Sequence, residues 1–148
     1  MKLLERLSAW LAATLVTAVT GSIVQTQFNL AAIAKLGAPV PIALRLQTTL
    51  QDLAGFAPML AAVAGAGLLV ALPVAAWLGR RLARPVLLYT LAGAAVIAVA
   101  ILLMNGVLPV TAIAATRSMA GFLALTACGA LGGWTFSRLA PQRRSAMA

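Results

Sequence analysis

The hydrophobic residues of this chain fall into four long runs, separated by short stretches that hold most of the charged residues. A helix rises about 1.5 Å per residue, so roughly 20 apolar residues cross the hydrocarbon core of a bilayer. We place the runs near residues 8–28, 56–78, 86–104 and 118–137. The pattern predicts an all-α integral membrane protein, in which residues 1–148 form a single domain with four transmembrane helices.

The segment between the first two runs, PIALRLQTTLQDL at residues 41–53, has a different pattern. Its apolar side chains, starting with Ile42, share one face of a helix, and its polar ones, ending with Asp52, share the other. This predicts a short amphipathic helix on the periplasmic side, which lies on the membrane surface or caps the bundle. In the alternative, the segment extends the second spanning helix outward, with a bend near Gly55 and Pro58.

The composition agrees with a membrane protein. Hydrophobic residues make up 63% of the chain, charged residues 9%, and the mean hydropathy is +1.03. Such a chain lacks the polar surface that covers a water-soluble globule. The net charge of +9 is compatible with nucleic-acid binding, but the cations lie in short clusters between apolar runs. Because no basic groove with interleaved aromatic residues is present, we expect no nucleic-acid partner.

The cations divide unevenly between the two sides of the predicted bundle. Eight of the eleven lie at the termini or between the second and third runs: Lys2, Arg6, Arg80, Arg81, Arg84, Arg138, Arg143 and Arg144. The other side has three: Lys35, Arg45 and Arg117. Cytoplasmic loops carry an excess of Lys and Arg, so both termini are predicted to be cytoplasmic in a multi-pass protein of the bacterial inner membrane. We expect Arg80, Arg81 and Arg84 to contact anionic lipid headgroups.

The side chains that carry most enzyme chemistry are scarce. The chain has no histidine, one cysteine, Cys128, and two carboxylates, Glu5 and Asp52. Metal sites, Ser-His nucleophiles and paired-carboxylate acid–base chemistry need side chains that this set does not supply. We therefore expect no catalytic residues, no metal and no cofactor, and we do not expect an enzyme.

The stretch SIVQTQFNL at residues 22–30 ends the first run with neutral amides instead of charges. Two of these amides, Gln25 and Asn29, follow Thr14 and Ser22 at helical spacing and complete a polar stripe. An amide that faces lipid loses water without gaining a partner. Gln25 and Asn29 are therefore predicted to point into the bundle.

Arg117 is the least expected charge, because a cation at the start of the fourth helix opposes the helix dipole and needs an acceptor or water. We predict a polar cluster near the outer end of the bundle, made of Gln25, Asn29, Asp52, Asn105 and Arg117. Gln27, on the opposite side of the first helix from Gln25, is expected to reach the headgroups or the outer segment. The sequence leaves open whether the cluster binds a ligand or only holds helices together.

Small residues recur at every fourth position in two of the runs. They are Ala120, Ala124, Cys128 and Gly132 in the fourth run, and Ala57, Ala61 and Gly65 in the second. Small side chains let helix backbones approach closely, which matters because lipid tails provide no hydrophobic drive for helix association. Both stripes are predicted to pack against helices, within the chain or between chains.

Three functions fit these patterns. The first is a small non-enzymatic inner-membrane protein that acts through helix packing, as an accessory or structural subunit of a homo-oligomer or larger membrane complex. The second is a channel or carrier for a small neutral or anionic solute, with an outward-facing polar vestibule. The third is a binder of lipids or other hydrophobic ligands. The small-residue stripes favour the first, whereas a continuous polar path would favour the second.

The charge asymmetry predicts the result of reporter fusions. A reporter that is active only outside the cytoplasm should be inactive when fused at Arg81 or after Ala140, and active when fused near Lys35. Activity at Arg81 would reverse the predicted orientation.

Overall fold

The computed structural model describes residues 2–82, 84–107 and 113–140, and within these ranges all regular structure is helical. The helices are α1 (Lys2–Lys35), α2 (Ile42–Leu82), α3 (Pro85–Val107), η1 (Ala114–Arg117), which is a short 3-10 helix, and α4 (Met119–Leu139). Each of the four α-helices is long and apolar enough to cross a membrane. The predicted all-helical chain with four candidate membrane spans is confirmed.

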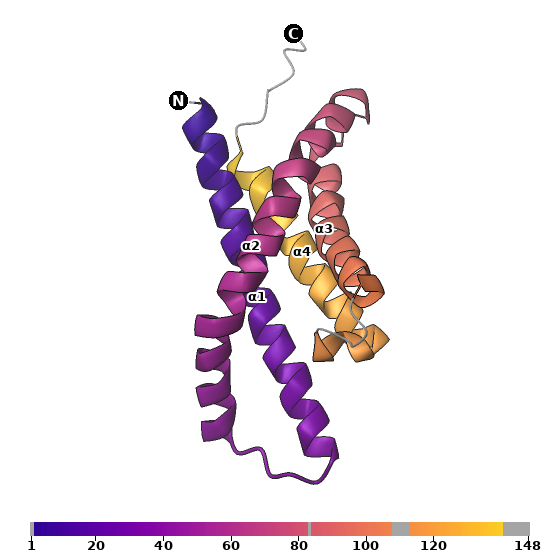
Figure 1. The fold of residues 1–148 in the computed structure, drawn as a ribbon. Coiled ribbons are helices and arrows are strands. Elements are labelled where there is room, and N and C mark those ends of the chain that lie inside the picture. Colours follow the sequence, from indigo (N-terminus) through magenta and orange to yellow (C-terminus); the bar gives the residue numbers. More distant parts are fainter. Residues whose placement is uncertain (1, 83, 108–112, 141–148) are drawn as a thin grey trace.

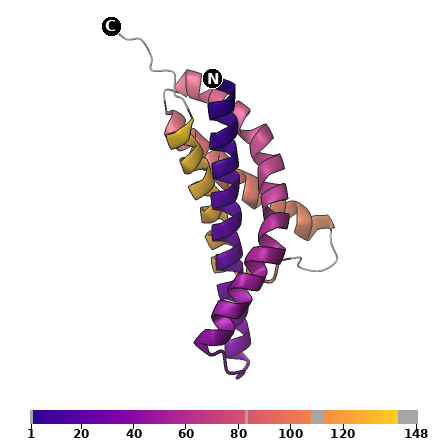
Figure 2. The same ribbon diagram turned by 90° about the vertical axis from the view of Figure 1, so that its left-hand side faces the viewer.

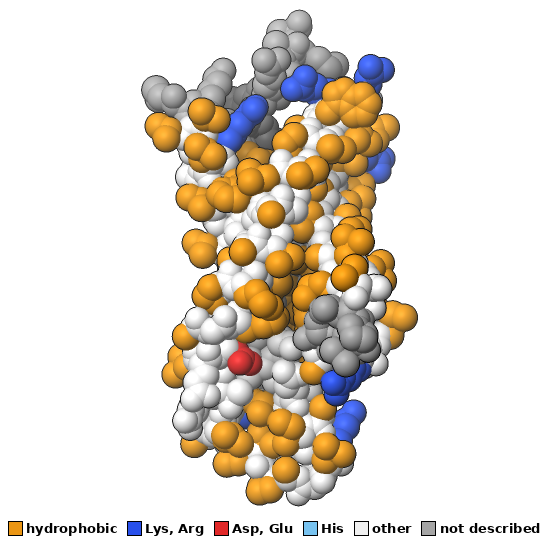
Figure 3. All heavy atoms as spheres, in the orientation of Figure 1, with side chains coloured by type: hydrophobic (Ala, Val, Ile, Leu, Met, Phe, Trp, Pro, Cys, Tyr) orange, Lys and Arg blue, Asp and Glu red, His pale blue; other side chains and the backbone are white. Residues whose placement is uncertain are grey.

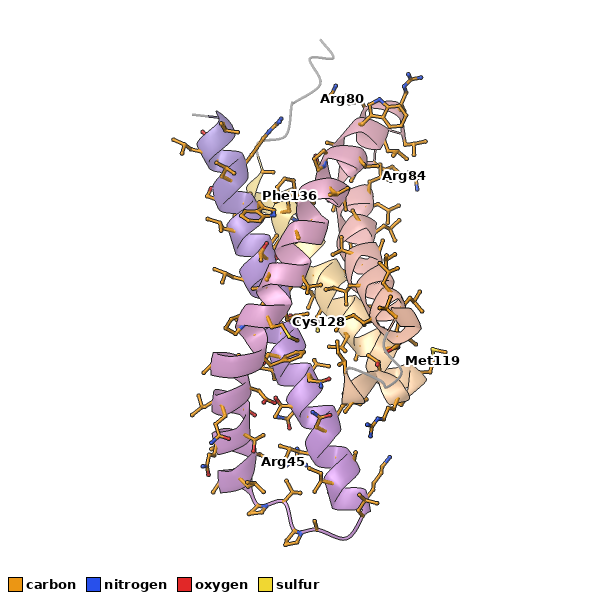
Figure 4. All side chains as sticks on the ribbon, viewed as in Figure 1. Arg45, Arg80, Arg84, Met119, Cys128 and Phe136 are labelled. Carbon is orange, nitrogen blue, oxygen red and sulfur yellow. The ribbon has the colours of Figure 1, made fainter. Side chains whose placement is uncertain are left out.

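The α-helices run antiparallel in chain order, so α1 begins and α4 ends at the same end of the bundle (Figure 1, Figure 2). Both α2 and α4 pack on α1, and α3 packs on α2 and α4. Figure 4 shows Arg80 and Arg84 at the end where α1 begins, and Arg45 near the opposite end. The assignment of these ends to the cytoplasm and the periplasm stays a prediction.

The first of the two predictions for the outer segment is wrong. Residues 41–53 do not form a separate amphipathic helix, because α2 starts at Ile42 and continues through Gly55 and Pro58. The alternative, an outward extension of the second spanning helix, matches these bounds, and Figure 1 shows α2 changing direction between its two halves. A proline inside a helix removes one backbone hydrogen bond and favours such a bend. Side-chain hydrogen bonds to α1, described below, hold this part of α2 alongside α1.

The first two α-helices are much longer than the last two. They contain 34 and 41 residues, against 23 and 21 in α3 and α4. At about 1.5 Å per residue, α1 and α2 are roughly 50 and 60 Å long, well beyond a hydrocarbon core of roughly 30 Å. Figure 1 shows the excess length as a helical hairpin that extends past α3 and α4. We call residues 26–53, which form this extension, the outer hairpin.

The backbone of α4 lies directly against that of α3. A Cβ atom added at Gly129 would collide with the carbonyl group of Gly93, and one added at Gly133 would collide with the carbonyl group of Tyr89. The same holds in reverse, since a Cβ atom at Gly93 would meet backbone atoms of both α4 glycines. Only glycine allows the two helices to come this close.

Another face of α4 approaches α1 in the same way. A Cβ atom at Gly132 would lie 2.7 Å from the Ala13 carbonyl oxygen and would collide with the Thr17 hydroxyl. That hydroxyl donates a hydrogen bond to the Ala13 carbonyl oxygen at 2.9 Å, so α1 satisfies it internally. Thr17 can therefore pack against α4 as a small side chain. Helix α4 thus lies between α1 and α3, in close contact with both.

The two predicted stripes contribute unequally to these contacts. Their buried members are Cys128, Gly132, Ala57 and Gly65, their partly buried members are Ala124 and Ala61, and Ala120 is exposed. No helix of the described chain covers Ala120, so its packing against another chain stays a prediction. Its neighbour Gly121 is buried instead, with no room for a Cβ atom beside the Ala115 carbonyl group of η1.

Substituting Gly132 tests the contact between α4 and α1. Gly132→Leu should sharply lower the yield of folded, monodisperse protein, because overpacking alone costs roughly 1–3 kcal/mol and here the backbones must separate. Gly106→Leu is the matched control, since Gly106 is exposed and has nothing within 4 Å of the Cβ position. Size-exclusion chromatography of the two detergent-solubilised variants measures the yield and the monodispersity of each. Equal yields of the two variants would contradict a close contact at Gly132.

Candidate functional site

A threonine and a carboxylate connect α1 to α2 in the outer hairpin. The Thr26 hydroxyl lies 2.6 Å from Oδ2 of Asp52 and 2.9 Å from the Ser22 carbonyl oxygen. A hydroxyl carries one proton, so the carboxylate and the carbonyl share a single donor. Thr26 is fully buried and Asp52 is partly buried. Because a hydrogen bond to a charged acceptor is strong in such surroundings, this contact fixes the outer half of α2 beside α1.

A second set of hydrogen bonds lies at the next residue of α1. Arg45 Nη1 donates to Gln27 Oε1 at 2.7 Å, and Gln27 Nε2 donates to the Thr49 hydroxyl at 3.3 Å. The Thr49 hydroxyl donates to the Arg45 carbonyl oxygen at 2.7 Å. Gln27 thus accepts from a cation and donates to a hydroxyl, which an amide can do and a single charged group cannot. The outer segment is one of the two contacts expected for Gln27, the other being the headgroups.

Helical spacing explains why these side chains meet. Arg45, Thr49 and Asp52 follow one another at intervals of four and three residues, so they share one face of α2. Thr26 and Gln27 are consecutive on α1 and point about 100° apart, so both can reach that face. We call Thr26, Gln27, Arg45, Thr49 and Asp52 the outer polar site.

Gln25 lies apart from this set. Its side chain is only 6% exposed, and its Oε1 atom has no hydrogen-bond partner among the described residues. Within the same part of the chain, the hydroxyls of Thr14 and Ser22, on the same stripe of α1, are likewise buried without a partner. A buried polar atom without a partner costs roughly 1–3 kcal/mol, so this stripe lowers the stability of α1 packing.

The remaining residues of the predicted cluster do not join the outer polar site. Arg117 is exposed at the end of η1, Asn105 is exposed near the end of α3, and Asn29 is partly buried on α1. Among the described residues, no hydrogen bond or ion pair links Arg117 to Gln25, Asn29 or Asp52. Arg45 supplies the cation instead, because the outer half of α2 lies against α1.

Thr26, Arg45 and Thr49 were not among the predicted cluster residues. A signal for them was present in the polar face of residues 41–53, which has the right helical spacing. The sequence did not indicate which way that face points, because it left open whether the segment lies on the membrane surface, caps the bundle or extends the second helix. Its direction depends on the continuation of α2 through Pro58.

An apolar groove lies next to the outer polar site, between α2 and α3. Its enclosed part is about 50 Å³ in volume, and all the side chains that line it are apolar. Phe56 and Met59 of α2 and Ala100 of α3 form its sides, and Leu125 of α4 lies at its base. Figure 3 shows apolar side chains over this face of the molecule. The groove suits a hydrocarbon chain better than a polar solute.

The opposite end of the bundle carries exposed cations beside tryptophans. The Arg81 guanidinium lies 5.9 Å from the Trp77 ring centre, and that of Arg138 lies 5.1 Å from the Trp134 ring centre. Trp10 instead points inward and donates to the Gly65 carbonyl oxygen at 3.1 Å. Paired Arg and Trp side chains suit a membrane interface. Contacts of Arg80, Arg81 and Arg84 with anionic lipid stay a prediction.

Comparison with known proteins adds no family assignment: no family model, curated protein or solved structure matches this chain. Within the described part of the chain, no group of three or more His, Cys, Asp or Glu side chains could hold a metal ion. The arguments about function therefore rest on the geometry of the outer hairpin and the groove.

A double-mutant cycle tests the outer polar site. Arg45→Ala and Gln27→Ala should be less than additive, with a coupling energy of about 1 kcal/mol in the free energy of unfolding in detergent. Arg117→Ala and Gln25→Ala form the control pair and should be additive within about 0.5 kcal/mol. Coupling between Arg117 and Gln25, without coupling between Arg45 and Gln27, would show that Arg117 and not Arg45 is the cation of the cluster.

Proposed function

We propose that the protein is a non-enzymatic protein of the bacterial inner membrane that acts through helix packing. It serves as an accessory or structural subunit of a homo-oligomer or of a larger membrane complex. The observation that carries this proposal is the outer hairpin, which extends past the rest of the bundle and exposes large apolar side chains.

Helix contacts indicate how far the hairpin projects. Gly21 of α1 faces Leu60 of α2 and Leu125 of α4, so these three residues lie at one level. From that level the start of α4, Met119, lies about 9 Å away, whereas the outer ends of α1 and α2 lie about 21 and 27 Å away. The hairpin thus extends roughly 12–18 Å past α4. A headgroup layer is only about 5–8 Å thick on each side.

The projecting surface is strongly apolar. Leu36 is 87% exposed, Leu46 is 62% exposed and Leu50 is 68% exposed. Beyond the hydrocarbon core such side chains face headgroups or water, where an apolar patch is unfavourable unless another protein covers it. A helical partner in the same membrane, or a second copy of the chain, would cover it.

The channel or carrier alternative has weaker support. Its best evidence is the polar stripe of α1, but these hydroxyls lie directly against neighbouring helices. A Cβ atom at Gly65 would be 3.3 Å from Thr14, and Gly132 leaves no space beside Thr17. The lipid-binding alternative is favoured by a specific feature, the apolar groove.

Site-specific crosslinking tests the proposed packing function. A photoreactive amino acid at Leu46 should give discrete adducts with a second copy or another membrane protein in intact membranes. The matched control is Leu69, which is also exposed on α2 but lies level with the core of the bundle. We expect at least a several-fold higher adduct yield at Leu46. Equal yields, or no protein adduct at Leu46, would contradict a protein partner at the outer hairpin.

A further inference from the structure

One face of α2 changes from polar to apolar along its length. Arg45, Thr49 and Asp52 occupy its outer part, and Phe56, Met59 and Val63 continue it inward at steps of four and three residues. The first three belong to the outer polar site, and the last three line the groove between α2 and α3. The exposed leucines of the outer hairpin lie on a different face, so this stripe is independent of the proposed packing surface.

The groove opens sideways, toward the position of lipid. Met59 is 49% exposed, while Leu60, one residue later, is buried at the base of the groove. The enclosed volume of about 50 Å³ accommodates only a few methylene-sized groups. A flexible hydrocarbon chain can lie along such a groove with one side against protein and the other against neighbouring lipid.

The polar end of the stripe lies near the depth of a lipid headgroup. Asp52 is one helical turn outward from Phe56, and about 12 Å outward from Leu60 along α2. That places it slightly beyond the start of α4, at the edge of the four-helix part of the bundle. Arg45 reaches inward to the same depth, because its guanidinium bonds to Gln27, the neighbour of Thr26.

These groups have unused hydrogen-bonding capacity. Asp52 Oδ2 accepts from Thr26, while its Oδ1 has no hydrogen bond to any described residue, and no ion pair forms at this carboxylate within the described chain. A guanidinium has five N–H donors, so Arg45 retains donors beyond its bond to Gln27.

We propose that this stripe binds a phospholipid with a primary-amine headgroup, of the phosphatidylethanolamine class. One acyl chain lies in the groove between α2 and α3, and the ammonium group donates to Asp52. The lipid phosphate lies within reach of Arg45. A carboxylate and a guanidinium at one depth match the two opposite charges of this headgroup, which a purely anionic or quaternary-ammonium lipid does not match as well.

Native mass spectrometry of the purified full-length protein tests headgroup selectivity. Phosphatidylethanolamine, phosphatidylcholine and phosphatidylglycerol are supplied in equal amounts, and the fraction of protein retaining one lipid is measured. The wild-type chain should retain phosphatidylethanolamine at least fivefold more than the other two, because of the three only it has a positively charged N–H donor for Asp52. Equal retention of the three lipids would overturn the proposal.

Two pairs of variants locate the site. Asp52→Asn should abolish the preference for phosphatidylethanolamine. The control Glu5→Gln should preserve it, because Glu5 lies in the first turn of α1, at the opposite end of the bundle from Asp52. Ala100→Phe should fill the groove and lower the retention of bound lipid at least fivefold, while Ala95→Phe, on the exposed face of α3, should not. An unchanged preference in Asp52→Asn, or equal effects of the two phenylalanine variants, would overturn the proposal.

Stability measurements on the wild-type chain guard against variants that do not fold. Added phosphatidylethanolamine should raise the melting temperature more than phosphatidylcholine or phosphatidylglycerol does. A protein dimer that covers the groove and is insensitive to headgroup would contradict lipid binding. Loss of the crosslinks at Leu46 would leave this inference unaffected, because that residue lies on another face of α2.

Discussion

Helices in a bilayer gain little from burying apolar surface against one another, because lipid tails are as apolar as the side chains they replace. What α4 offers instead is close backbone contact. Gly129 and Gly133 admit the backbone of α3, and Gly132 admits that of α1. Dispersion forces increase steeply as surfaces approach, so these glycines hold the bundle together in a place where larger apolar residues would not. These contacts fix the places of α1 and α3 on either side of α4.

The outer hairpin is held together by a different kind of interaction. Beyond the first residue of α4, α1 and α2 continue side by side, and hydrogen bonds between Thr26 or Gln27 and α2 connect them. Neutral amides and hydroxyls suit this position, because each can donate and accept without bringing an unpaired charge to the edge of the membrane. Asp52 and Arg45 are the two charges in this network, and each has a neutral partner on α1.

The two long helices therefore present three surfaces with separate properties. One is the interface with α3 and α4, another is the apolar outside of the outer hairpin, and the third is the stripe that runs from Arg45 to the groove. Packing within the chain uses the first. The proposed protein partner would use the second and the proposed lipid the third, so one helix pair could serve both without competition. None of these roles calls for a catalytic side chain, which agrees with the small number of titratable residues in the sequence.

The sequence by itself determined the helical class, the number of candidate spans and the use of small residues, because length, hydropathy and helical period are local properties of the chain. It also gave the outer segment as one of two expected contacts of Gln27. It did not determine the course of residues 41–53, since a proline such as Pro58 can either end a helix or bend it. Once α2 continues through Pro58, Arg45 meets Gln27 and Asp52 meets Thr26, while Arg117 is left at the surface. Only the tertiary structure decided that Arg45, and not Arg117, contacts α1 there. The choice depends on which helix lies beside α1 at that depth, and the local sequence pattern does not specify the neighbours of a helix.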